Sequence, residues 1–317
     1  MEKISLIIPV YNAQEYLERC LQSAVSQEYF NIEIICVDDG STDDSGYILD
    51  DFAGKYRNIV AIHQENGGES RARNRGLSVA TGDYIGFLDC DDWIEADMYS
   101  QLSAKLKEYN ADMAVAGWIK EFPEHSIVME NQKKVNEGVI YQNELLKYVY
   151  HRDEYQGFAY MWNKLYKRKL LYDDNYKLIK FDENLMLGGD IVYLAEILMN
   201  VDKAVYIDRP FYHYRQRMES GSHSQNVYAR IDSLTAYDHV IALFQKNSVS
   251  ETILKFVKRF QVYHSTNIAE IAFETHNAEA LNICHDYMKR YETEYVETNQ
   301  GYQDRLERFY RIQKYKL

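Results

Sequence analysis

Three carboxylates directly follow one short apolar run. Residues 84–88 are apolar or small, and Asp89, Asp91 and Asp92 come next, with only Cys90 among them. A run of this length, bounded by turn residues, is typical of a buried strand. Carboxylates this close repel one another unless a cation or a set of hydrogen-bond donors compensates their charge. The spacing therefore favours a strand end that presents acids to a divalent metal ion, one as a ligand and the other towards a metal-bound water or a hydroxyl.

The same acids also fit a simpler interpretation. Asp92 could be the N-cap of a helix that starts at Trp93, because acidic side chains are favoured at N-caps and in the first helical turn. This interpretation accounts for Asp92 and in part for Asp91, but it gives Asp89 no role. From these residues alone, both interpretations stay open.

Strand and helix patterns alternate before and around this stretch. Strands are predicted over residues 4–10, 32–37, 59–62, 84–88 and 113–116. Helices are predicted from Ala13 to Val25, from Ser41 or Thr42 towards Phe52, over 70–79 and over about 96–109. This alternation predicts an α/β protein with a Rossmann-like, mostly parallel sheet and helices on both faces.

Polar residues stand where the predicted strands end. Tyr11 follows the first strand, Asp39 the second, Asn66 the third and Asp89 the fourth. Ligands of open α/β sheets bind outside the carboxyl ends of the strands, so we expect one pocket along this edge. The sequence contains neither a GxGxxG dinucleotide fingerprint nor a GxxxxGK[ST] phosphate loop.

The composition excludes several classes of protein. A net charge of -13 and a pI near 5.2 oppose binding to nucleic acid, which needs a basic surface. No apolar stretch reaches the roughly 18 residues of a membrane span, and no signal-peptide pattern precedes the first strand. The cysteines show no metal-type spacing, as is typical of reduced thiols in a cytosolic protein. We therefore expect a cytoplasmic protein, with the inner face of the membrane as an alternative location.

The pattern becomes less regular after residue 117. Residues 118–140 suggest an irregular or antiparallel excursion, residues 141–175 a helical segment rich in basic and aromatic side chains, and residues 204–207 and 211–215 two closing strands. From about residue 228 the spacing of apolar positions is helical throughout. We expect a domain over residues 1–224, with halves 1–117 and 118–224, and a helical C-terminal region over 225–317.

Four segments at the strand ends form a set, namely SLIIPVYN at residues 5–12, VDDGSTD at 37–43, NGG at 66–68 with ARNRG at 72–76, and FLDCDD at 87–92. In order and spacing, this set resembles the motifs of family 2 glycosyltransferases. The resemblance is strong over about residues 3–118. It continues more loosely to about residue 224 through WNKLY at 162–166, Gly189-Asp190 and YHYR at 212–215. It does not clearly cover the residues that follow.

The resemblance implies a GT-A fold and an inverting transfer of a sugar from a nucleotide donor, usually a UDP-sugar. Matched position by position, the resemblance implies that Pro9, Val10 and Tyr11 contact the uridine and that Asp39 accepts from the uracil N–H. Asn66 and Arg73 are implied to lie beside them, and Asp89 to contact the ribose or a metal-bound water. Cys90 and Arg215 are the remaining residues implied to bind the donor. Asp91 is implied to ligate Mn²⁺ or Mg²⁺, with Asp89 as its companion in the metal site.

Asp190 matches the position of the family's catalytic base. The family usually has a glutamate directly before this aspartate, and here Gly189 stands in its place. Without the resemblance, the residues favour Asp190 as the N-cap of a helix over residues 191–199; the resemblance favours the base. Arg215, together with Ser220, Ser222 and His223, is expected on a loop that closes over the donor phosphates.

Three functions are compatible with these features. The first is a metal-dependent inverting glycosyltransferase that moves a hexose or N-acetylhexosamine to a glycan or lipid-linked acceptor. The second is a sugar-phosphate nucleotidylyltransferase, but the residues after the first strand are not the Gly-rich basic loop that it needs. The third is a non-catalytic nucleotide-sugar-binding or scaffold protein, which Gly189 favours. The C-terminal helices leave a peripheral membrane contact or a homo-oligomer contact open.

Overall fold

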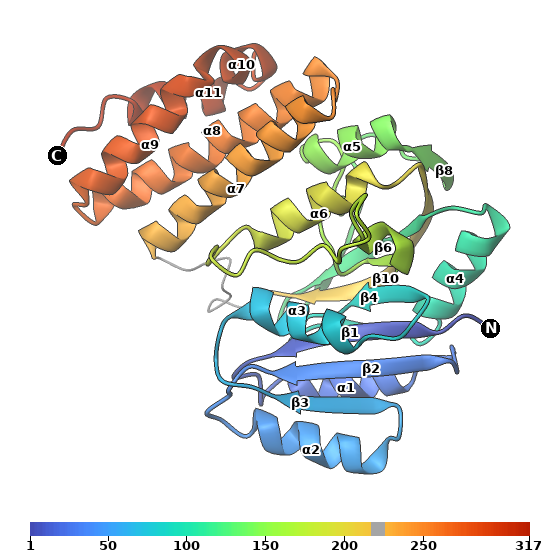
Figure 1. Cartoon of the computed structure of the whole chain (residues 1–317). Coiled ribbons are helices and arrows are strands. Elements are labelled where there is room, and N and C mark those ends of the chain that lie inside the picture. Colours follow the sequence, from blue (N-terminus) through green and yellow to red (C-terminus); the bar gives the residue numbers. More distant parts are fainter. Residues whose placement is uncertain (217–225) are drawn as a thin grey trace. The chain divides into compact units, whose positions relative to one another are not determined.

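The computed structural model describes residues 1–216 and 226–317 in two compact units (Figure 1). The first unit consists of Met1–Glu183 and Glu196–Arg217, and the second of Asn184–Ala195 and Met218–Leu317. The domain boundary expected between residues 224 and 225 lies outside the described residues. The units are therefore described one at a time.

Four parallel strands form one half of the sheet in the first unit. They are β1 (Ile4–Val10), β2 (Ile32–Asp38), β3 (Ile59–His63) and β4 (Tyr84–Phe87), in the order β3-β2-β1-β4. Every residue of β1 and β4 is buried, as expected for parallel strands that are covered on both faces. Because the strands are parallel, their carboxyl ends lie along one edge of the sheet.

Helices cover both faces of this parallel half. They are α1 (Leu17–Val25), α2 (Ser45–Lys55) and α3 (Glu69–Val79). Helix α4 (Met98–Glu108), which follows β4, packs mainly on strands of the other half of the sheet. The strand order runs outward from β1 to β3 and then returns to β4, so right-handed crossovers place α3 on the face opposite α1 and α2, as Figure 1 shows. The helix expected from Ala13 begins at Leu17. The cap of α2 is Asp44 instead of Ser41 or Thr42, because Ser41 belongs to the turn that Asp38 binds.

The other half of the sheet is mixed. Strand β9 (Lys164–Lys167) lies antiparallel between β4 and β6 (Met113–Glu121), and β10 (Lys203–Arg215) runs parallel to β6. Short antiparallel strands complete the ten-stranded sheet, namely β5 (Trp93–Ile94) on β10, β7 (Ser126–Met129) on β6 and β8 (Gly138–Tyr141) on β10. The sheet is therefore parallel in its first half and largely antiparallel in its second.

Two expectations for this half were wrong, and the alternative in which Asp92 caps a helix that starts at Trp93 is not realised. The segment around residues 162–168 was expected to be helical, but it forms β9 and a 3₁₀ turn, η1 (Arg168–Leu171). The residues after Asp92 begin β5 instead of a helix. The two strands expected over 204–207 and 211–215 are one strand, β10, which carries register shifts around Pro210. Proline has no N–H to donate to the ladder, so the pairing with β6 is interrupted there.

The second unit is helical and has its own core. Its helices are α7 (Val227–Lys246), α8 (Glu251–Glu274), α9 (Ala278–Arg290), α10 (Glu292–Thr298) and α11 (Gln303–Ile312). The side chains of Asn226 and Asn277 cap α7 and α9 by accepting hydrogen bonds from backbone N–H groups. The buried apolar residues of these helices form one cluster, which includes Leu234, Val262, Ala269, Leu281 and Phe309.

Two further helices come, in chain order, between strands of the mixed half of the sheet. They are α5 (Gln142–Tyr150), in the first unit, and α6 (Gly189–Met199), whose first seven residues belong to the second unit.

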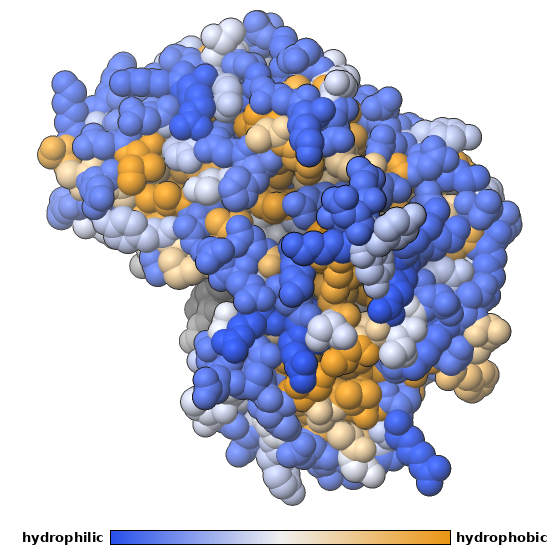
Figure 2. All heavy atoms as spheres, viewed as in Figure 1, coloured by the Kyte–Doolittle hydropathy of each residue, from blue (hydrophilic) through white to orange (hydrophobic). Residues whose placement is uncertain are grey.

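The face shown in Figure 2 is mostly hydrophilic, with hydrophobic residues in patches between the polar ones, in keeping with a mean hydropathy of -0.50. None of the helices in the described ranges is both long enough and apolar enough to cross a membrane.

Candidate active site

The ends of β1 and β2 are bound to each other through their backbones. The carbonyl oxygen of Val10 accepts a hydrogen bond of 2.8 Å from the N–H of Asp39. The next residues continue the link, since the side chain of Asn12 accepts from the N–H of Thr42 at 2.8 Å. Pro9 and Val10 are buried in the strand, whereas the Tyr11 side chain is 51% exposed. Tyr11 therefore presents an open aromatic ring at the edge where a ligand is expected.

Asp39 organises the turn after β3. Its carboxylate is 2% exposed and accepts hydrogen bonds from the N–H of Gly67 at 3.0 Å, the N–H of Gly68 at 2.7 Å and the Gln64 side chain at 2.7 Å. A carboxylate has about four acceptor positions, so these donors occupy most of them. A uracil N–H at Asp39 would have to share an oxygen with this turn. The predicted contact with the base stays a prediction, and Asn66 lies beside it with an exposed side chain.

Gly40 is the residue that brings these two turns together. Its φ is +73°, and a Cβ at this position would lie 2.8 Å from the backbone nitrogen of Asn66. Any other residue would be strained by the positive φ and would also collide with that backbone. The glycine of the VDDGSTD segment is thus explained by the close approach of the turns after β2 and β3.

Helix α3 delivers Arg73 to the end of β4. The Arg73 side chain is 8% exposed, and its Nη2 donates to Oδ1 of Asp89 at 2.9 Å and pairs with Oε1 of Glu69 at 2.7 Å. Burial raises the pKa of Asp89 to about 7, and the neighbouring charges of Glu69 and Asp91 add to this effect while Arg73 opposes it. A single guanidinium therefore does not offset the cost of burying this carboxylate among other acids.

Asp92 is buried and accepts hydrogen bonds from β10; it does not cap a helix. Its side chain is 1% exposed and accepts hydrogen bonds from the hydroxyl of Tyr212 at 2.7 Å and from the N–H of Arg215 at 2.8 Å. Burial, followed by the charges of Asp91 and Asp89, raises the pKa of Asp92 well above its usual value. Like Asp89, this acid is held in a place where its charge is only partly compensated.

Arg215 connects the end of β10 to the same acids. Its Nε donates to the carbonyl oxygen of Asp91 at 3.0 Å, and its guanidinium lies 5.0 Å from the ring centroid of Tyr16 and 4.9 Å from that of Trp93. Cys90 and Asp91 are half-buried in the same segment. The structure therefore brings Arg73, Asp89, Asp91 and Arg215 together, although they come from three separate parts of the chain.

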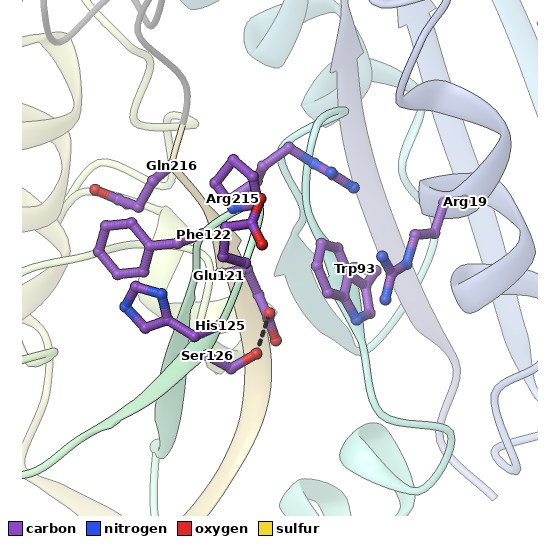
Figure 3. Close-up of a pocket in the computed structure, with 10 residues that line it drawn as sticks. Arg19, Trp93, Glu121, Phe122, His125, Ser126, Arg215 and Gln216 are labelled. Atoms are coloured by element: carbon purple, nitrogen blue, oxygen red, sulfur yellow. Dashed lines mark hydrogen bonds between the residues drawn. The ribbon is translucent and has the colours of Figure 1, made fainter.

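A cavity of about 430 Å³ opens beside Arg215 (Figure 3). Figure 3 shows Arg19, which projects from α1, next to the ring of Trp93, with the hairpin between β6 and β7 opposite. The guanidinium of Arg19 lies 3.3 Å from the Trp93 ring centroid, and burial together with the charge of Arg215 lowers the pKa of Arg19. The other residues that line the cavity are Glu121, Phe122, Pro123, Glu124, His125, Ser126 and Gln216.

The acids after β4 fit a metal site that the substrate completes. Within residues 1–216 and 226–317, no group of three or more His, Cys, Asp or Glu side chains is arranged to hold a metal ion. Mg²⁺ and Mn²⁺ prefer oxygen ligands, and Mg²⁺ is commonly bound by one or two carboxylates together with substrate phosphates. Burial and the neighbouring acids raise the pKa of Asp89 and Asp92, and a cation bound beside them would favour their ionised forms. Asp91 stands between them in the sequence, and its role as a metal ligand stays a prediction.

Asp190 belongs to the second unit. It stands in the first turn of α6, and the preceding Gly188 has a φ of +94° and approaches α7, where a Cβ would lie 2.8 Å from that of Ala236. Its role as a base stays a prediction. Ser220, Ser222 and His223, expected on a loop over the donor phosphates, lie outside the described residues.

Comparison with known proteins decides the family. Residues 5–174 match the family described as Glycosyl transferase family 2. The chain belongs to this family. Over 228 residues it is 38% identical to the glycosyltransferase GlyA of Streptococcus pneumoniae. The aligned region covers 69% of this chain but only 31% of GlyA. The chain thus spans about a third of the length of that relative.

Two solved structures show the family's fold. Residues 1–349 of TarS from S. aureus, in complex with UDP-GlcNAc, align with 94% of this chain and 92% of that one, at a TM-score of 0.60 and 19% identity. The mannosyltransferase PcManGT of Pyrobaculum calidifontis, in complex with GDP-Man and Mn²⁺, aligns with 98% and 86%, at a TM-score of 0.57 and 14% identity. The predicted GT-A fold with additional C-terminal helices is confirmed.

Several contacts around the acids of residues 89–92 were not expected from the sequence. Asp92 was expected only as a member of the acidic cluster or as a helix cap, Tyr212 had no role of its own, and Arg19 was not singled out. A signal was present for Tyr212, which falls in the YHYR segment of the resemblance. No local sequence pattern predicts that a hydroxyl on β10 contacts a carboxylate 120 residues earlier in the chain.

Proposed function

We propose that the chain is a metal-dependent inverting glycosyltransferase that moves a hexose or N-acetylhexosamine from a UDP-sugar to a hydroxyl of a glycan or lipid-linked acceptor. The observation that supports this proposal is the cluster of Asp89, Asp91 and Asp92 at the end of β4. The cluster is tied to Arg73 and Arg215 and lies at the same sheet edge as Tyr11 and Asp39.

The donor is assigned from the family and from the shape of this edge. TarS, which shares the fold, forms complexes with UDP and with UDP-GlcNAc. In this chain Tyr11 offers an exposed ring on which a uracil can stack. Asp39 lies at the neighbouring strand end, where its N–H binds the carbonyl of Val10, and the Asn66 side chain is exposed. Pro9 and Val10 would contact the nucleotide through their backbones, and Cys90 would line the same surface.

Asp91 and Asp89 would hold Mn²⁺ or Mg²⁺. The bound cation would neutralise the charge that develops on the departing diphosphate. Asp89 is oriented by Arg73, so its free oxygen can accept from the ribose or from a metal-bound water. Arg215 would contribute a second positive charge on the side of the phosphates, since its guanidinium is anchored at the carbonyl of Asp91.

Asp190 would remove the proton of the acceptor hydroxyl. One general base and one displacement invert the anomeric centre, and a carboxylate within hydrogen-bond reach of the hydroxyl is sufficient. Gly189 in place of the usual glutamate removes one neighbouring acid from Asp190. This difference is also what favours the second candidate, a nucleotide-sugar-binding protein without turnover.

Calorimetry and a product assay separate these functions. UDP should bind more tightly with Mn²⁺ than without it, and UDP should be released from one of UDP-glucose, UDP-galactose and their N-acetyl forms when acceptors are added. Asp190→Asn should abolish turnover while leaving UDP binding intact, and Asp174→Asn, at an exposed acid, serves as the control. Binding without turnover on either acceptor class would favour the non-catalytic candidate. Absence of UDP binding would refute both candidates.

A further inference from the structure

We propose that Asp92 and Tyr212 are positioning residues, which form a buried bridge that fixes the backbone carrying Asp89 and Asp91 and joins it to Arg215. This inference rests on the proposed function, because it concerns how the donor and metal site is held in shape. Neither residue need touch the donor: each acts through the backbone of its neighbours.

The carboxylate of Asp92 is buried and binds two groups of β10. It is 1% exposed, and each of its oxygens has a donor on β10: the Tyr212 hydroxyl at 2.7 Å for Oδ2 and the Arg215 N–H at 2.8 Å for Oδ1. Two strands that are more than a hundred residues apart are thus joined by one side chain. A carboxylate that spans two donors in this way restricts the position of its own backbone.

The Tyr212 hydroxyl makes two hydrogen bonds with opposite roles. It donates to Asp92 and accepts from the N–H of Asp89 at 3.2 Å. The ring is held in turn by Trp162, with ring centroids 4.0 Å apart and planes 20° apart, and both residues are buried. The phenol is therefore a rigid support under Asp89, whose carboxylate is then turned towards Arg73.

Arg215 adds two further hydrogen bonds between β10 and the segment that carries the acids. Its backbone N–H binds Asp92 and its Nε binds the carbonyl oxygen of Asp91. The pairing of Tyr212 with Ile94 and of His213 with Trp93 continues the connection into β5. Asp89 and Asp91 thus project from a segment whose main chain is held from β10 at both residues.

Loss of the bridge should loosen the geometry of the acids and leave their chemistry in place. Metal-dependent binding of the donor needs the two carboxylates and Arg215 at fixed separations, so it should weaken first. The chemical step, once the donor is bound, should change less. A residue with a merely structural role would lower thermal stability without this selective effect on metal-dependent binding.

The test compares two tyrosines of the same strand. Tyr212→Phe removes only the hydroxyl and keeps the stacking on Trp162. Tyr206→Phe is the matched control, since the Tyr206 hydroxyl also donates to an aspartate, Asp208, at 2.8 Å, but away from the acids. We expect Tyr212→Phe to weaken UDP binding in the presence of Mn²⁺ by roughly tenfold, with a similar rise in donor KM and less than a threefold change in kcat. Tyr206→Phe should leave all three quantities unchanged.

A double-mutant cycle tests the bridge itself. Asp92→Asn and Tyr212→Phe break the same contact, so the double variant should bind UDP and Mn²⁺ much more tightly than the product of the two single effects would give. Unchanged binding and KM in Tyr212→Phe, or independent effects of the two substitutions, would overturn the positioning role. Absence of UDP binding by the wild-type chain would instead overturn the proposed function, and this inference with it. If Tyr212→Phe does not fold, Asp92→Asn alone provides the comparison of binding with kcat.

Discussion

Acids at the two ends of the parallel strands have pKa values shifted in opposite directions. Glu33, at the start of β2, accepts hydrogen bonds from Lys3, from the Ser5 hydroxyl and from both the N–H and the hydroxyl of Thr81. Burial opposes them, but these donors lower the pKa of Glu33 to about 2. At the other end, burial raises the pKa of Asp89 to about 7 despite its contact with Arg73.

The difference separates an acid whose charge is stabilised by the fold from an acid whose charge is opposed by its surroundings. Glu33 has a donor for each of its acceptor positions, so its charge stabilises the folded chain. After β4, burial and the neighbouring acids disfavour the charged forms of Asp89 and Asp92, so ionising these two side chains costs stability. Perturbed acids at the carboxyl edge of a sheet are typical of functional sites. Substitutions at both ends of the strands, together with ligand titration, test this contrast.

Removal of one acid from the cluster should have the largest effect on activity. Asp91→Asn removes a charge and a metal ligand, and we expect kcat/KM to fall on the order of 1,000-fold, as for the loss of one electrostatic stabiliser of a transition state. Measurement of UDP release checks this. Glu33→Gln should keep wild-type activity at temperatures where it is folded. A similar loss in both variants would remove the contrast between the two ends.

Acid should unfold the chain through Glu33. Its pKa is about 2 in the folded state and near 4.5 when unpaired, so its contribution to stability is fully present above pH 4.5 and is lost as the pH falls towards 2. The shift corresponds to about 3 kcal/mol of unfolding free energy. Urea unfolding at pH values from 2 to 6 should show this slope in the wild type and a smaller slope in Glu33→Gln. Equal slopes would show that Glu33 is not the responsible group.

Ligand binding should stabilise the chain through the acids after β4 and not through Glu33. With Mn²⁺ and UDP at about a hundredfold over their dissociation constant, the unfolding free energy should rise by about 2.7 kcal/mol. The melting temperature should rise accordingly, and EDTA should reverse the rise. Asp91→Asn should show little shift, whereas Glu33→Gln should melt earlier but keep the full shift. A shift that persists in Asp91→Asn would place the metal elsewhere.

Tyr11 offers the smallest effect. Tyr11→Ala removes the exposed ring at the end of β1, and we expect UDP binding to weaken roughly tenfold because stacking on the base is lost. Tyr47→Ala, at a tyrosine of α2 that is 77% exposed, is the control and should bind UDP normally. Isothermal titration of UDP in the presence of Mn²⁺ measures both. Equal binding by the wild type and Tyr11→Ala would remove the ring from the donor site.

The parallel half of the fold could be predicted almost completely from the sequence. Strands β1 to β4 are short apolar runs between turn residues, and a strand that is buried on both faces needs no partner to be recognised. The acids at their ends, and the turn glycines Gly40 and Gly68, are read from local sequence in the same way. What the sequence could not show is that Asp39 uses its oxygens to hold the turn after β3.

The sequence alone determined which residues end each parallel strand, because burial leaves a local pattern in the order of apolar and polar residues. Tertiary structure alone decided that the segment around Leu165 is a strand, since it is the edges of β4 and β6 that supply its hydrogen bonds. It also decided that Tyr212 and Arg215 reach the acids of residues 89–92. Contacts between distant strands depend on pairing and packing, which leave no periodic signal in either segment.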